Sequence, residues 1–186
     1  MIRDQRFTPA QRLLHWLMAA CILAMLFIGV GMVSTVMPKY LALVSIHKTL
    51  GVAILVLALI RLALRLRFGA PRLPPDLPEP IKLAAHASHL AFYALMIGMP
   101  LLGWGMLSAA GYPVVLLGGL RLPAILPQSA SVHALLWNTH FYLAFAFFAL
   151  ILVHVAAALL HALVRRDHVF ETMGPALLRG EAAPAE

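Results

Sequence analysis

Five histidines share one seven-residue register in the last long apolar stretch of the chain, and Phe147 occupies the vacant step. The five are His133, His140, His154, His161 and His168. On an α-helix seven residues turn about 700°, about 20° short of two full turns, so the series forms one slowly drifting stripe. His140 and His154 would lie about 21 Å apart on nearly the same face. Imidazoles bind metals, carry protons and donate hydrogen bonds. Because a polar side chain in a membrane span costs free energy, its presence there favours one of these functions.

The composition places these histidines in a membrane protein. Hydrophobic residues make up 62% and charged residues 11% of the 186 residues, whereas a soluble domain carries roughly 25% charged residues. The formal net charge is +7, but the basic residues cluster beside apolar segments, which indicates topology and lipid contacts rather than nucleic acid. Because Cys21 is the only cysteine, an internal disulfide and a CxxCH haem attachment are excluded. The acidic residues lie outside the apolar runs, which argues against carboxylate-bridged metal sites.

Four segments are long and apolar enough to cross a hydrocarbon layer of about 30 Å, which takes about 20 residues. They predict an all-α, integral membrane four-helix bundle that forms a single membrane domain over residues 1–186. The proline-rich segment 69–80 predicts a stiff, non-helical linker. The apolar, glycine- and proline-rich segment 108–130 is expected to lie on the bundle at the membrane surface. The expected spans are 11–33, 41–66, 81–107 and 133–164, with 165–186 as a cytoplasmic tail.

Lysine and arginine counts predict the orientation. Four spans put the N-terminus, the 66–80 connection and the C-terminus on one side, which holds eleven of the fourteen basic residues. The other side holds only Lys39, Lys48 and Arg121. Both termini are therefore expected in the cytoplasm.

This topology pairs four histidines by depth. His15 begins the first span on the cytoplasmic side, at the level of His154. His47 begins the second span on the outer side, at the level of His140. Two bis-imidazole sites stacked across a membrane fit b-type haem, which axial histidines from facing helices hold without a covalent bond.

The residue four positions after each histidine separates the same four from the others. A flat macrocycle needs a small residue beside its ligand. Four residues after each of the four come Ala19, Gly51, Ala144 and Ala158. At the same spacing the bulkier Leu90, Tyr93 and Trp137 follow His86, His89 and His133. Two other interpretations stay open at this point. The histidines could be structural hydrogen-bonding residues of a haem-free scaffold, and a zinc or copper cluster would need ligands at one depth, which the 21 Å separation disfavours.

Three more histidines, on the cytoplasmic side, are candidate contacts of a quinone headgroup or a haem propionate. They are His86 and His89, one turn apart in the third span, and His161, two turns below His154. Ordinary interfacial histidines are the alternative. Arg12 and Arg61 could pair with propionates, although topology already accounts for them. Phe147 is assigned to core packing, and His133 and His168 receive no role.

Four stretches resemble the bacterial cytochrome b561 family: RLLHW at 12–16, SIHKTLGVAILVLALIRLALRL at 45–66, AHASHLAFYALMIGMPLLGW at 85–104 and NTHFYLAFAFFALILVHVAAALLH at 138–161. The resemblance extends over about residues 7–173. It implies a four-helix membrane bundle with two b haems per chain. Their axial ligands fall on His15 with His154, and on His47 with His140.

The resemblance also implies a function. The family includes the superoxide oxidase of the bacterial inner membrane, which passes electrons from superoxide at the outer face to ubiquinone. The expected partners are therefore membrane lipid, a quinone and an outer-face donor, either superoxide or a redox protein. Related diheme bundles anchor a dehydrogenase or hydrogenase and link it to quinone. The compact chain favours the stand-alone enzyme, with the anchor subunit as the alternative.

Overall fold

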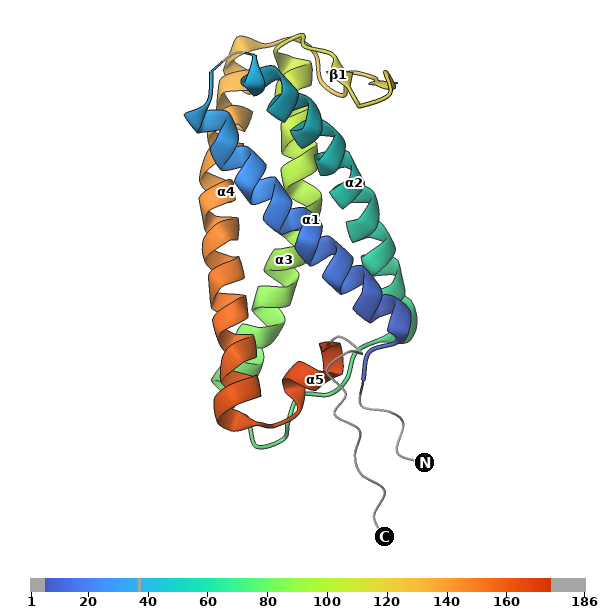
Figure 1. Ribbon diagram of the computed structural model, residues 1–186, viewed down its shortest axis with the longest axis vertical. Helices are drawn as coiled ribbons and strands as arrows, with labels where there is room; N and C mark the ends of the chain where they lie inside the picture. Colours follow the sequence, from blue (N-terminus) through green and yellow to red (C-terminus); the bar gives the residue numbers. More distant parts are fainter. Residues whose placement is uncertain (1–5, 37, 175–186) are drawn as a thin grey trace.

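Four long helices make up most of the computed structural model, which describes residues 6–36 and 38–174 (Figure 1). All four are long and apolar enough to cross a membrane, which confirms the predicted four-helix transmembrane bundle. A π-helical turn, Leu160–Arg165, extends the last of them. The helices are α1 Pro9–Ser34, α2 Lys39–Phe68, α3 Glu79–Ala109 and α4 Ala130–Leu159.

Local sequence signals explain where these helices begin and end. Thr8 and Gln11 form a capping box at the start of α1, with Gln11 N donating to Thr8 Oγ1 and Thr8 N donating to Gln11 Oε1, which satisfies two backbone donors. The Ser129 side chain caps α4 by accepting from Val132 N. Helix α2 ends at Phe68, and its C-cap residue Gly69 has a φ of 73°, which favours glycine.

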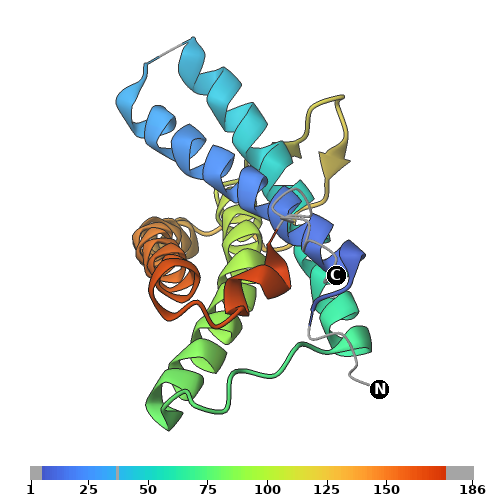
Figure 2. The same ribbon diagram turned by 60° about the horizontal axis from the view of Figure 1, so that its bottom comes forward.

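The four helices pack in sequence order. Helix α1 packs on α2, α2 on α3, and α3 on α4, whereas neither α1 nor α2 packs to a similar extent against α4 among the described residues. Figure 2 shows α4 standing apart from the neighbouring helices α1 and α2. A small core still joins all four helices and consists of Leu14, Met18, Ala58, Met96 and Phe147. Large apolar side chains such as Phe27, 78% exposed, face the space that lipid fills.

The connection between α3 and α4 contains a short β-hairpin that the sequence did not reveal. Strand β1 (Val114–Val115) pairs antiparallel with β2 (Arg121–Leu122). Leu117 N donates to Thr49 Oγ1 of α2 at 2.9 Å, and Trp104 Nε1 of α3 donates to Pro123 O at 2.8 Å. The connection therefore lies against α2 and α3, as its apolar character predicted. We call this end of the bundle the hairpin end.

The opposite end carries a second unpredicted element, the short helix α5 (Val169–Met173), and is called the α5 end. Figure 2 shows α5 lying close to the start of α1. Trp16 Nε1 of α1 donates to Met173 O at 2.9 Å, and Arg12 donates to Gly174 O. The expected cytoplasmic tail 165–186 thus begins as ordered structure, and its residues 175–186 lie outside the described ones.

The proline-rich linker between α2 and α3 also differs slightly from expectation. Helix α3 begins at Glu79 with a proline in its first turn, so the last two residues of segment 69–80 are helical. Proline is tolerated there because the first helical N–H groups have no partner within the helix.

Candidate functional site

At the hairpin end, His47 of α2 faces His140 of α4. Their ring centroids lie 6.2 Å apart, with an angle of 62° between the ring planes. The Nδ1 atoms of both rings are buried and have no hydrogen-bond partner among the described residues. A buried polar atom left in this state costs roughly 1–3 kcal/mol. A metal ion bound at Nε2 of each ring would leave Nδ1 as a donor, and the Met99 carbonyl acts on His140 as an acceptor.

At the α5 end, His15 of α1 faces His154 of α4 in the same way. Their ring centroids lie 6.3 Å apart at 68°. A third imidazole, His89 of α3, lies 6.4 Å from His154. Phe92, one turn after His89, contacts His154 edge-on, with a ring-centroid distance of 5.0 Å. The structure thus brings together the four histidines that depth paired, and adds His89 to the second pair.

The ring separations suit one metal ion held between two imidazoles. An imidazole nitrogen lies about 1.2 Å from the ring centre and a metal–imidazole bond is about 2.0–2.1 Å long, so two rings on opposite sides of a metal ion have centroids about 6.4 Å apart. Within residues 6–36 and 38–174, no three His, Cys, Asp or Glu side chains converge on one point as a metal cage would require. Each site therefore presents two facing imidazoles, which is the arrangement that a bis-imidazole ligand pair requires.

The two histidine pairs join helices that pack little against each other. His15 and His47 belong to α1 and α2, and both face α4, against which neither helix packs extensively in the described part of the chain. Gly103 of α3 adds space at the hairpin end, because a Cβ placed there would lie 3.5 Å from His140 Cε1. Facing imidazoles across separated helices, with a glycine beside one ring, fit the edge and faces of a haem.

Aromatic side chains fill the space between the two sites. Phe147 lies between His140 and His154 along α4 and is 8% exposed. Its ring packs edge-on against Phe92 at a centroid distance of 6.0 Å. Phe147 belongs to the small core, in agreement with the packing role expected from the sequence.

A buried guanidinium distinguishes the α5 end. Nη1 of Arg61 on α2 is buried and has no hydrogen-bond partner among the described residues. Its charge acts on both His15 and His154. The Tyr93 hydroxyl acts on this guanidinium, and the buried Nη1 left without an acceptor suits an anion. The carboxylates of a haem propionate have this chemistry, so Arg61 remains a candidate partner.

His86 and Arg12, two other candidate contacts, have protein partners of their own, as does His133, which received no role from the sequence. His86 Nδ1 lies 2.7 Å from Lys82 O within α3. Arg12 donates to Gly174 O, and His133 Nδ1 lies 2.9 Å from Met106 O. Of the three histidines proposed as quinone contacts, only His89 lies beside a ligand pair.

His161 is held by a carboxylate. Its Nδ1 lies 2.7 Å from Asp167 Oδ2, and Arg165 Nε donates to the same oxygen at 2.9 Å. Arg165 also pairs with Asp76 of the linker at 2.6 Å. Burial alone would raise the pKa of Asp167, but hydrogen bonds from Arg165, His161 and the Val169 backbone outweigh it and hold the pKa below its usual value. This network joins the end of α4, the linker and α5.

Sequence reasoning missed Gly103 and Phe92 because both lie on α3, which carries neither member of the two pairs. Small residues were sought only on the ligands' own helices. Which face of α3 meets α4 depends on the packing of the bundle, and no signal in the chain marks it.

Comparison with known proteins agrees with these sites. The sequence profile of the family described as prokaryotic cytochrome b561 matches residues 6–176. Two similar proteins of Escherichia coli (strain K12) are cytochrome b561 homolog 2, with 27% identity over 91% of both chains, and cytochrome b561 homolog 1, with 29% identity over 91% of this chain and 97% of the relative. A probable superoxide oxidase CybB of Yersinia pestis is 33% identical over 70% of this chain and 73% of its own length.

Proposed function

Because the chain belongs to the prokaryotic cytochrome b561 family of b-type membrane cytochromes, we propose that it holds two b haems and transfers electrons across the inner membrane. The proposed axial ligands are His47 with His140 at the hairpin end, and His15 with His154 at the α5 end. The donor is an outer-face reductant, with superoxide as the candidate, and the acceptor is ubiquinone. The activity is that of a superoxide:ubiquinone oxidoreductase.

One observation carries this proposal. Two imidazole pairs, with ring centroids 6.2 Å and 6.3 Å apart, face each other across helices that pack little against each other among the described residues. Apolar side chains ordinarily fill the contacts between packed helices, whereas imidazoles face each other at these two places. A haem bound between each pair would supply one-electron chemistry that no side chain in the bundle provides.

The charge at the hairpin end is positive, but it amounts to three basic residues against eleven on the other side. Segments 34–40 and 108–130, with the first turns of α2, contain Lys39, Lys48 and Arg121 and no acidic residue. Lys48 directly follows the proposed ligand His47. Cations without compensating carboxylates raise the local concentration of an anion such as superoxide. By the lysine and arginine distribution this end faces the outside.

His89 is the proposed contact of the quinone. It is exposed in the structure, and its ring lies 6.4 Å from that of His154. An imidazole can donate a hydrogen bond to a quinone carbonyl and supply a proton when the quinone is reduced. The quinone would then be reduced at the α5 end, where the positive charge of Arg61 would offset negative charge that develops on the quinone.

Haem content and electron transfer by the purified chain test the proposal. Pyridine haemochrome analysis should give two b haems per chain, and zero or one would overturn the diheme assignment. The haem-loaded protein alone should reduce ubiquinone when supplied with superoxide. Two haems without this activity would reject the stand-alone enzyme and favour the anchor subunit of a partner dehydrogenase or hydrogenase.

A further inference from the structure

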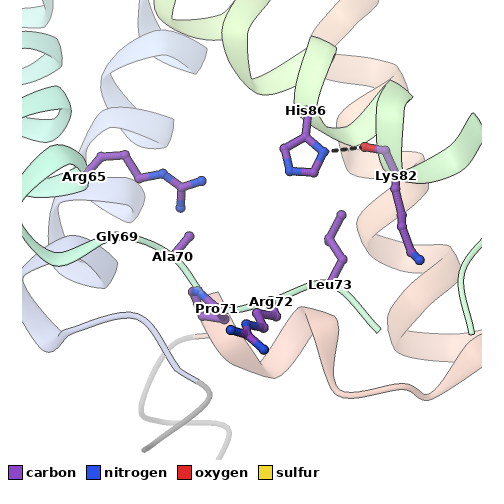
Figure 3. A pocket seen from close by; sticks show the side chains of 8 residues that line it. All are labelled: Arg65, Gly69, Ala70, Pro71, Arg72, Leu73, Lys82 and His86. Atoms are coloured by element: carbon purple, nitrogen blue, oxygen red, sulfur yellow. Dashed lines mark hydrogen bonds between the residues drawn. The ribbon is translucent and has the colours of Figure 1, made fainter. Parts of the chain in front are cut away.

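A basic pocket lies at the α5 end, between the end of α2, the start of α3 and the linker that joins them. Its volume is about 520 Å³. Arg65 and His86 point toward each other from opposite walls, and the linker residues Pro71, Arg72 and Leu73 lie below them (Figure 3). None of the acidic residues within the described ranges lines the pocket.

The cations of this pocket are not equally free to bind a ligand. Lys82 Nζ is engaged by Glu79 Oε1 at 2.9 Å and by Pro75 O at 3.3 Å, and its side chain points away from the pocket centre in Figure 3. The guanidinium groups of Arg65 and Arg72 make no ion pair with any described residue. Arg65 stacks over the Phe7 ring at 5.7 Å, which leaves the N–H edge of the guanidinium able to donate.

The protein holds the walls of the pocket in place. The buried Gln11 side chain of α1 donates to Gly69 O at 3.1 Å, at the first residue of the linker. At the other end, Arg165 pairs with Asp76 at 2.6 Å, and Leu77 is 5% exposed. Prolines stiffen the segment between these anchor points. A pocket built in this way loses little entropy when a ligand binds.

The depth of the pocket identifies the ligand. Helix α2 has 30 residues, which corresponds to about 45 Å, and this exceeds a hydrocarbon core of about 30 Å. Arg65 is three residues from its end and therefore lies at the level of lipid headgroups. Basic pockets between transmembrane helices on the cytoplasmic side suit phosphate headgroups. The preference of cytoplasmic loops for basic residues explains why arginines lie on this side. That preference does not require them to line a pocket, because exposed residues such as Arg67 meet it equally well.

We propose that the pocket bounded by Arg65, Arg72 and His86 binds the phosphate of an anionic glycerophospholipid. The guanidinium groups of Arg65 and Arg72 hold the phosphate oxygens, and His86 adds a donor through its Nε2. The apolar residues Ala70, Pro71 and Leu73 contact the glycerol and the first carbons of the acyl chains. The bound lipid links α2 to α3 at the end where the linker alone connects them.

Native mass spectrometry of the haem-loaded protein in detergent, titrated with dioleoyl phosphatidylglycerol, tests this site. Wild-type protein should bind phosphatidylglycerol in preference to phosphatidylcholine with the same chains. Arg65→Gln and Arg72→Gln should each weaken binding about fivefold, equivalent to roughly 1 kcal/mol per arginine. Arg67→Gln is the matched control, since it removes the same charge two residues from Arg65 but outside the pocket, and should change binding less than twofold.

Three results would overturn the proposal. An equal loss in Arg67→Gln would mean that the affinity is a general property of the basic surface. Equal binding of phosphatidylcholine would exclude recognition of an anionic headgroup. Inorganic phosphate that binds the pocket and displaces phosphatidylglycerol at equal concentration would identify a free-phosphate site. The haem spectrum, recorded on every variant, shows that a lost lipid does not reflect a lost fold.

Discussion

The histidine pairs at the two ends of the bundle have nearly the same ring separation, 6.2 Å at the hairpin end and 6.3 Å at the α5 end, but different surroundings. The hairpin-end rings have buried Nδ1 atoms without partners among the described residues and a glycine of α3 beside one of them. The α5-end pair has a third histidine, a phenylalanine and a buried arginine around it.

This difference separates the residues that would bind the iron from those that would set the redox potential of the haem. Both pairs have the ring separation of an axial ligand pair, but among the described residues the buried Nη1 of Arg61 lies at the α5 end. A positive charge favours the reduced state of an adjacent haem and so raises its potential. The proposed haem at the α5 end should therefore have the higher potential, which favours electron movement from the hairpin end toward the α5 end.

Removal of one ligand should have the largest effect. His140→Ala and His47→Ala should each abolish the same haem, and His154→Ala and His15→Ala the other, because a six-coordinate bis-imidazole site needs both rings. Haem per chain should fall from two to one in each single variant, measured with the reduced-minus-oxidised spectrum. His89→Ala is the control and should keep both haems. If His89→Ala lost a haem and His15→Ala kept both, the ligand of His154 would be His89 and not His15.

Filling the space beside His140 should affect the hairpin end alone. Gly103→Leu would force a side chain toward the ring, which lies in ordinary contact with a Cβ at that position, and should lower occupancy of the hairpin-end haem by about half or more. Gly98→Leu is the matched control, because a Cβ there meets nothing within 4 Å and the residue is turned about 140° away around the helix. If the two variants kept equal haem content, Gly103 would not border the site.

Neutralising the buried arginine should act on the potential of one haem. Arg61→Gln should lower the potential of the α5-end haem by tens of millivolts and change the hairpin-end haem less, because the charge acts on His15 and His154. Redox titration followed by absorbance measures both. Arg67→Gln, which removes the same charge at an exposed position nearer the end of α2, serves as the comparison. Equal shifts of both haems in Arg61→Gln would contradict the local role of the charge.

The Asp167 network should contribute the smallest effect. Asp167→Asn removes the carboxylate shared by His161 and Arg165, and should lower stability by roughly 1–3 kcal/mol with both haems retained. Because the pKa of Asp167 is lowered in the fold, its stabilisation is complete above the ordinary aspartate pKa and is lost only as pH falls through the lower folded value. Thermal unfolding at pH 7 and limited proteolysis near α5 measure the effect. Glu171→Gln, an exposed change on α5, should leave both unchanged.

Hydropathy and the positions of the histidines were enough to predict the four helices and the four paired imidazoles. A span must be long and apolar to satisfy its backbone in lipid, and alternating spans fix the depth of every residue. His15 therefore had to lie at the level of His154, and His47 at the level of His140, whatever the packing of the bundle. The hairpin, α5 and the role of Asp167 were not predictable, because short elements held by a few long-range hydrogen bonds leave no periodic signal.

The sequence by itself thus determined which residues share a depth, since depth follows from counting residues along a helix of known rise. Only the tertiary structure decided which residues share a site. Rotation of each helix about its axis and the choice of neighbours placed Gly103 beside His140, His89 and Arg61 near His154, and Asp167 on His161. Those contacts depend on side-chain packing between helices far apart in the chain, and a one-dimensional pattern does not record it.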